Sequence, residues 1–160
     1  MAAASTNANT NVVLMGATFK YAGAVAGALG YSLEDVALAT GLMANAGIKG
    51  EQAGTSLRSM MSRMTAPTKQ VQAAMDKLGL TVKNSDGSMK PFGQTMQELR
   101  AKFAGMSDSE KAQYASMIAG QEAMSGFLAI VNASDSDFAK LSNAVNHADG
   151  AAAKMAKTNE

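Results

Sequence analysis

One imidazole, His147, and no cysteine occur among the 160 residues. Cysteine-dependent chemistry is therefore excluded, including thiolate zinc sites, thiol nucleophiles and disulfide frameworks. A serine, histidine and aspartate arrangement is formally available, but one histidine among many serines and aspartates gives it no specificity. We interpret His147 as a polar residue near the end of the last predicted helix. We expect no catalytic residue, no metal ligand and no cofactor.

Carboxylates occur in close pairs, and paired carboxylates are what general acid-base catalysis and glycoside hydrolysis require. The pairs are Glu34 with Asp35, Asp108 with Glu110, and Asp135 with Asp137. Each pair falls just inside a predicted helix start, where the helix N-terminus favours negative charge. Helix capping explains all of them, although the sequence leaves open that carboxylates from separate elements face each other across a cleft.

Two polar loops resemble ligand-binding motifs only in part. Asn84, Asp86 and Gly87 look like a fragment of a calcium loop, but the first ligand position would then be Val82, which has no side-chain oxygen. We therefore interpret them as a hairpin turn. The glycines between 41 and 50 miss the spacing of a phosphate-binding loop. Helix termination accounts for that stretch, with Asn45, Gly47, Ile48 and Gly50 as the terminating motif.

Charge and composition narrow the function classes further. Lys and Arg number 14 against 13 Asp and Glu, so the net charge is +1, and aromatic residues make up 5%. Such a chain has neither the positive field nor the stacking platform typical of nucleic-acid binding, so we expect no specific nucleic-acid binding. Methionine is unusually frequent, at 13 residues. Helical spacing places most of them in a core, and an adaptable interface is the alternative.

Apolar residues recur at helical spacing, and glycines, prolines and capping residues punctuate the runs. The pattern predicts helices near residues 11–30, 32–45, 50–65, 67–79, 92–105, 107–120, 124–131 and 138–145. The fold class is mainly α: a compact, orthogonal bundle of about seven or eight short helices, with one small β-hairpin near residues 80–90. Residues 1–10 are expected to be a flexible segment, 11–146 the helical core domain, and 147–160 a frayed or truncated tail.

The stretch from Val12 to Leu29 is nearly long enough to span a membrane and carries one charge, Lys20. Its many glycines and alanines favour a buried or interface helix instead. Gly16, Gly23 and Gly27 are candidates for a helix-helix or self-association face, because small residues let two helix backbones approach closely.

Several blocks in the chain resemble, in the correct order, the core domain of phage tail tape measure proteins of the lactococcal-phage type. The principal block is LMANAGIKGEQAGTSLRSMMSRMTAPTKQVQAAMDKLGLTV, residues 42–82. The likeness continues in DGSMKPFGQTMQELR (86–100), AGQEAMSGFLAIVNA (119–133) and NAVNHADGAAAKMA (143–156), and it extends upstream to about Thr6. Nearly the whole chain is covered.

The resemblance implies a structural and morphogenetic role in tail assembly, tail length determination and genome ejection, and no enzymatic activity. The implied partners are other tail proteins, namely the inner wall of the tube, the tail assembly chaperone and the tail tip, with homo-oligomers as a further expectation. The implied locations are the lumen of the virion tail and, during assembly, the host bacterial cytoplasm. Family members are longer, so we expect a domain of a longer parent chain or a truncated prophage copy. The alternative function is membrane insertion of the 12–29 helix during DNA delivery.

Overall fold

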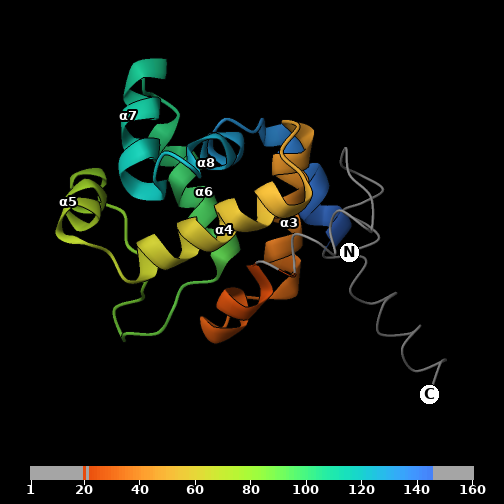
Figure 1. The fold of residues 1–160 in the computed structure, drawn as a ribbon, viewed down its shortest axis with the longest axis horizontal. Coiled ribbons are helices and arrows are strands. Elements are labelled where there is room, and N and C mark those ends of the chain that lie inside the picture. Colours follow the sequence, from red (N-terminus) through yellow and green to blue (C-terminus); the bar gives the residue numbers. More distant parts are fainter. Residues whose placement is uncertain (1–19, 21, 146–160) are drawn as a thin grey trace.

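The computed structural model describes residue 20 and residues 22–145, and these are helical with connecting turns (Figure 1). The labelled helices are α3 (Leu33–Asn45), α4 (Gly50–Thr65), α5 (Lys69–Leu78), α6 (Phe92–Phe103), α7 (Asp108–Ala119) and α8 (Met124–Val131). Residues 22–28 and 135–145 are helical as well. The prediction of a mainly α fold is confirmed. The segments predicted as a flexible start, 1–10, and as a tail, 147–160, lie outside the described residues.

Capping side chains explain why several of these helices begin where they do. The Ser32 hydroxyl accepts a hydrogen bond from the Asp35 amide at 3.2 Å, at the start of α3. At the start of α7, Ser107 and Glu110 form a reciprocal capping box. Both arrangements satisfy backbone N–H groups that have no partner within the helix, and both follow from the sequence spacing.

The helix α8 lies at the centre of the described fold and contacts α3, α4, α6 and α7. Gly126 permits its close packing, because a Cβ atom there would lie 2.8 Å from the Ser56 Cβ on α4. On the neighbouring position, the Phe127 ring meets the Phe103 ring edge-on, with centroids 5.4 Å apart. Fully buried methionines fill much of the surrounding space: Met43, Met60, Met61, Met64, Met75 and Met96. Unbranched thioether side chains suit such irregular gaps between short helices.

The expected β-hairpin near residues 80–90 is wrong. Within the described residues there is no strand, and the segment forms a turn closed by one antiparallel bridge between Lys83 and Met89. A two-stranded hairpin is marginal by itself and needs longer pairing. Here Leu80 and Val82 are buried and Thr81 between them is exposed, as in a strand, but the pairing stops after one bridge. Pro91, which lacks an N–H donor, leads directly into α6.

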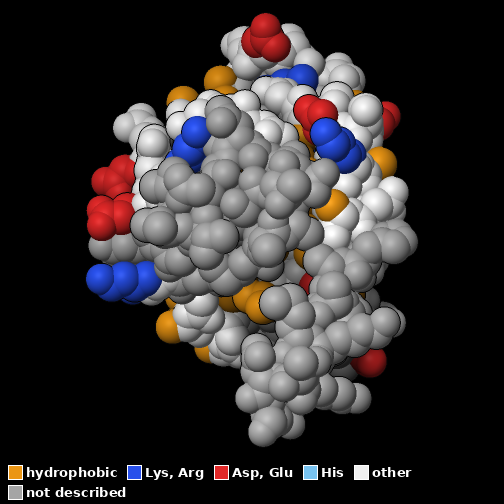
Figure 2. Space-filling view, turned by 90° about the vertical axis from the view of Figure 1, so that its right-hand side faces the viewer, with side chains coloured by type: hydrophobic (Ala, Val, Ile, Leu, Met, Phe, Trp, Pro, Cys, Tyr) orange, Lys and Arg blue, Asp and Glu red, His pale blue; other side chains and the backbone are white. Residues whose placement is uncertain are grey.

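The described surface is mostly polar. On the face shown in Figure 2, hydrophobic side chains appear as small separate patches among charged ones. Leu33, at the start of α3, is the large hydrophobic residue recorded as exposed among the described residues. No helix in this part of the chain is long and apolar enough to span a bilayer.

Candidate functional site

The helical residues 22–28 present a face of small residues to the outside. Ala22 and Ala26 are buried and Val25 packs partly against the core, whereas Gly27 is exposed and Gly23 is half-buried. Apart from the adjoining residues and the backbone of its own helix, a Cβ atom at Gly23 or at Gly27 would meet no atom of the described residues within 4 Å. Gly16, the third residue predicted for this face, lies outside the described residues. The structure therefore leaves this side of the helix open to an incoming backbone.

A shallow apolar groove of about 340 Å³ runs along the same helix, where it meets the end of α4. Ala24, Val25, Ala28 and Leu29 form one wall, and Ser62, Thr65 and Ala66 form the other. The groove and the glycine face belong to one continuous helix surface. No charged side chain lines the groove, so any partner held there would be recognised by shape and apolar contact.

The predicted helix-terminating motif lies at the turn from α3 to α4. The helix α3 ends at Asn45, Gly47 adopts a φ of +87°, and the Ile48 amide donates to the Met43 carbonyl at 2.9 Å. Gly50 opens α4 with a φ of +57°. The left-handed conformation is cheap for glycine, and the bond back to Met43 satisfies a carbonyl at the end of α3.

This turn borders a groove with a volume of about 760 Å³. Its apolar side chains include Leu42, Ile48 and Leu128, and amide side chains from Asn45 and Asn132 lie at its edge. Asp137 is the one ionisable residue among those that line it. The groove therefore lacks the set of acids, bases and nucleophiles that catalysis would need.

The residues predicted as a hairpin turn form a tight, exposed turn. The Asn84 amide donates to the Ser88 carbonyl at 2.7 Å, and the Asp86 carboxylate accepts from the Ser88 amide at 3.0 Å and from its hydroxyl at 2.6 Å. The hydrogen bonds from the Ser88 hydroxyl and amide lower the pKa of Asp86. Gly87 completes the turn with a φ of +89°. The side chains of Asn84, Asp86 and Ser88 thus bond within the turn itself.

Ionisable groups elsewhere in the described part of the chain serve the helix ends. Asp35 accepts from the Gly93 amide at 2.9 Å, Glu110 completes the α7 cap, and Asp135 pairs with Arg100 at 2.7 Å. Burial raises the pKa of Tyr31 to about 12, so its phenol stays neutral. Residues 20 and 22–145 contain no group of three or more metal-binding side chains. His147 lies outside them.

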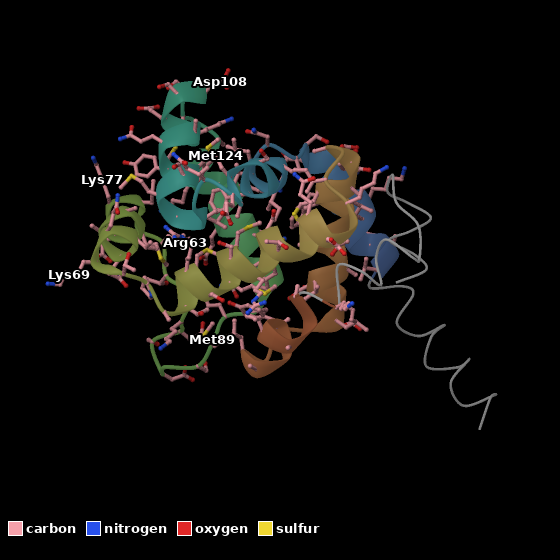
Figure 3. The ribbon with its side chains drawn as sticks, in the orientation of Figure 1. Arg63, Lys69, Lys77, Met89, Asp108 and Met124 are labelled. Carbon is pink, nitrogen blue, oxygen red and sulfur yellow. The ribbon has the colours of Figure 1, made fainter. Side chains whose placement is uncertain are left out.

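Long-range contacts of three side chains have no signal in the sequence. Arg63 on α4 donates to the carbonyls of Ile118 and Met117, at 3.0 and 3.1 Å, at the end of α7 (Figure 3). Asp35 and Arg100 make comparable contacts, to Gly93 and to Ala133 respectively. The partners are separated by 33 to 58 residues along the chain. Pairing over such distances depends on the tertiary arrangement and not on local spacing.

The described residues form capped helix ends and open grooves, and we find no cluster of reactive side chains among them. Comparison with known proteins identifies the family. The family model described as phage-related minor tail protein matches residues 1–120. The chain belongs to this family.

Named relatives of this phage tail chain make the assignment more specific. It is 40% identical to the tape measure protein of Pneumococcus phage Dp-1 over 157 residues, which is 98% of this chain and 14% of that protein. It is 33% identical over 138 residues to the probable tape measure protein of Escherichia phage P2, covering 84% of this chain and 17% of that protein. The chain thus spans less than a fifth of either relative. No solved structure matches it. The resemblance found in the sequence is confirmed.

Proposed function

We propose that this chain is an assembly and anchoring domain of a phage tail tape measure protein, working as part of a longer parent chain. The observation that carries the proposal is the combination of family membership with short helices, the longest labelled one having 16 residues, that fold back on one another. A ruler needs an extended element, in which each added residue adds length. A folded domain instead offers surfaces.

The domain would lie in the lumen of the virion tail and, before that, in the host cytoplasm where tails assemble. Its partners would be the inner wall of the tail tube, the tail assembly chaperone and the tail tip. It would support tail length determination and genome ejection through these contacts, without enzymatic activity, cofactors or specific binding of nucleic acid. Residues 11–146 are the domain that we expect to fold as a unit.

An insertion experiment in the parent phage gene separates an anchor from a ruler. Twenty residues of strong helix-forming sequence would be inserted between Asp86 and Gly87, in the exposed turn, where the chain should tolerate added length. If this domain measured length, the tail would grow by ~30 Å, at ~1.5 Å per helical residue. We expect tails of unchanged length in electron micrographs. Proportional lengthening would overturn the proposal, and a scrambled insertion of equal size serves as the control.

We further propose that the open face at Gly23 and Gly27 joins two copies of the domain. Glycine inside a helix costs about 1 kcal/mol relative to alanine. Nothing within the described fold requires either residue to lack a side chain, because the space around them is open. Glycine at these positions would allow the backbone of a second helix to approach closely.

The test of self-association uses Gly23→Ala, Gly27→Ala and the double variant. We expect each monomer to be more stable by about 0.5–1 kcal/mol, while light scattering after size exclusion shows weaker association. Gly105→Ala is the matched control, since its added Cβ would also meet nothing within 4 Å. Unchanged association in both 22–28 helix variants would refute this role for the face.

Membrane insertion of residues 12–29 is not favoured. In the described part of this stretch, Ala22 and Ala26 are buried against the other helices, so insertion would have to remove them from the core. Leakage of dye from liposomes would test the alternative directly. Gly23→Arg should abolish leakage if the helix enters the bilayer.

A further inference from the structure

We propose that the 135–145 helix is a detachable strap, which swings away about a hinge at residues 132–134 while α3 to α8 stay folded. Arg100 is the residue that keeps it closed. This device is independent of the anchoring role proposed above and concerns only how the domain opens.

The 135–145 helix buries fewer residues than α4 does. Phe138, Leu141 and Val145 are its buried residues, whereas α4 buries residues along its whole length. Grooves border it on more than one side. Ser134 and Asp137 line the 760 Å³ groove, and Phe138 and Val145 line a second groove of about 440 Å³ next to α3 and the start of α6. Few apolar contacts therefore oppose its release.

Polar contacts of Arg100, which we call the clamp, hold the 135–145 helix in place in addition to its apolar packing. The Arg100 guanidinium donates from Nε and Nη2 to the Ala133 carbonyl, at 3.3 and 2.8 Å. It also lies 4.5 Å from the centre of the Phe138 ring. Its ion pair with Asp135, at 2.7 Å, is the weakest part of the clamp, because the Asp135 side chain is fully exposed. The Arg100 side chain thus contacts the hinge at Ala133, the first turn of the helix at Asp135 and the buried ring of Phe138.

The helix can move without losing its own first turn. Ser134 accepts from the Asp137 amide through its hydroxyl and from the Phe138 amide through its carbonyl, both at 3.0 Å. These bonds lie within the moving segment. The hinge residues Asn132 and Ala133 donate their amides to the Leu128 and Ile130 carbonyls of α8, at 2.9 and 3.3 Å. Lys111 Nζ also donates to the Asn132 side chain at 2.9 Å.

Residue-resolved hydrogen exchange on the 160-residue chain tests the proposal. We expect the amides of residues 139–145 to exchange faster than those of α4 and α8 in the unaltered protein. Arg100→Ala should speed their exchange at least about tenfold and leave α4 and α8 unchanged, because it removes charge-assisted bonds from one local opening. Asp135→Asn, which removes only the exposed ion pair, should change it less than about threefold.

Arg63→Ala is the matched control, because it removes a guanidinium that holds the end of another helix. It should speed exchange near the end of α7 and leave residues 139–145 unaffected. The strap does not exist if residues 139–145 exchange at the same rate as α4 in the unaltered chain, or if Arg100→Ala speeds all helices equally. Should Arg100→Ala fail to fold, Arg100→Lys is measured instead. It keeps the charge but loses the fork and the ring stacking, and unchanged exchange of 139–145 would then overturn the proposal.

Discussion

Single side chains connect helices of this domain by reaching the free backbone groups at another helix's end. Asp35 satisfies an amide at the start of α6, and Arg63 and Ser59 satisfy carbonyls in the last turn of α7. Such groups have no partner inside their own helix and would be costly if buried unpaired. Local caps such as Ser32 could be predicted from spacing, whereas these cross-helix caps could not, since nothing near Asp35 in the sequence identifies Gly93.

The Asp35 cap makes a specific prediction for Gly93. A Cβ atom there would lie 2.7 Å from the Asp35 Oδ1, so Gly93→Ala must displace the carboxylate. We expect a loss of about 1 kcal/mol in the free energy of unfolding, measured by chemical denaturation. In an Asp35→Ala background the same substitution should be neutral or stabilising. Equal costs in both backgrounds would show that the cap is not responsible.

Tyr31 makes a prediction that depends on pH. Its ring stacks on Phe92 with centroids 5.0 Å apart, and its buried hydroxyl has no hydrogen-bond partner among the residues that the structure describes. Burial raises its pKa from 10.0 to about 12, so the folded state holds this proton more tightly than the unfolded state. Its contribution is therefore complete below about pH 10 and is lost as pH rises towards 12.

Comparison with Tyr31→Phe isolates this effect, because other titrating groups are common to both proteins. Near pH 7 the variant should be as stable as the parent or slightly more stable, since an unpaired buried hydroxyl is removed. Between pH 9 and 12 the parent should lose about 1–2 kcal/mol more than the variant in urea unfolding. Parallel pH profiles would contradict the burial of the phenol.

At the scale of elements, the sequence was most informative where a helix starts or stops by local chemistry. The capping box of α7 and the glycine that follows α5, Gly79 with a φ of +68°, fall where the spacing predicts them. The predicted strands are wrong although Leu80 and Val82 alternate with exposed neighbours, because the pairing ends after the single bridge between Lys83 and Met89. How the helices pair could not be predicted, because an apolar face shows that a helix is buried but not which other helix covers it.

The junction of α4 with α7 is the element contact most open to test. Arg63→Ala removes the two bonds to the Ile118 and Met117 carbonyls and leaves them less well satisfied. We expect a loss of about 1.5–3 kcal/mol in thermal or chemical unfolding, as is typical of hydrogen bonds that involve a charged group. Arg63→Lys should recover part of this at most, since an ammonium lacks the planar fork. Full recovery by lysine would show that charge alone matters there.

At the scale of the whole molecule, stability depends on a short helix that contacts four others. The helix α8 has eight residues and contacts α3, α4, α6 and α7. Gly126 faces Ser56 and Met43 at distances that leave no room for a methyl group. The core formed by α3 to α8 should therefore unfold as one unit, with α8 in contact with four of its other helices.

Gly126→Ala should accordingly weaken the entire core. The added Cβ would lie 2.8 Å from the Ser56 Cβ and 3.0 Å from the Met43 sulfur, so helices must move apart. We expect a loss of about 1–3 kcal/mol, with a lowered but still single unfolding transition in calorimetry. Ser125→Ala, at an exposed position of the same helix, is the control and should change stability by less than about 0.5 kcal/mol. A loss of similar size in the control would point to the helix itself and not to its packing.

The single bridge between Lys83 and Met89 also affects how the chain behaves when many copies lie close together. Strand edges are templates on which neighbouring chains add further strands, and this leads to aggregation. The described part of this chain offers no such edge, because its turn pairs once and then enters α6. Many copies held close together would therefore have no sheet edge in this region from which a fibre could grow.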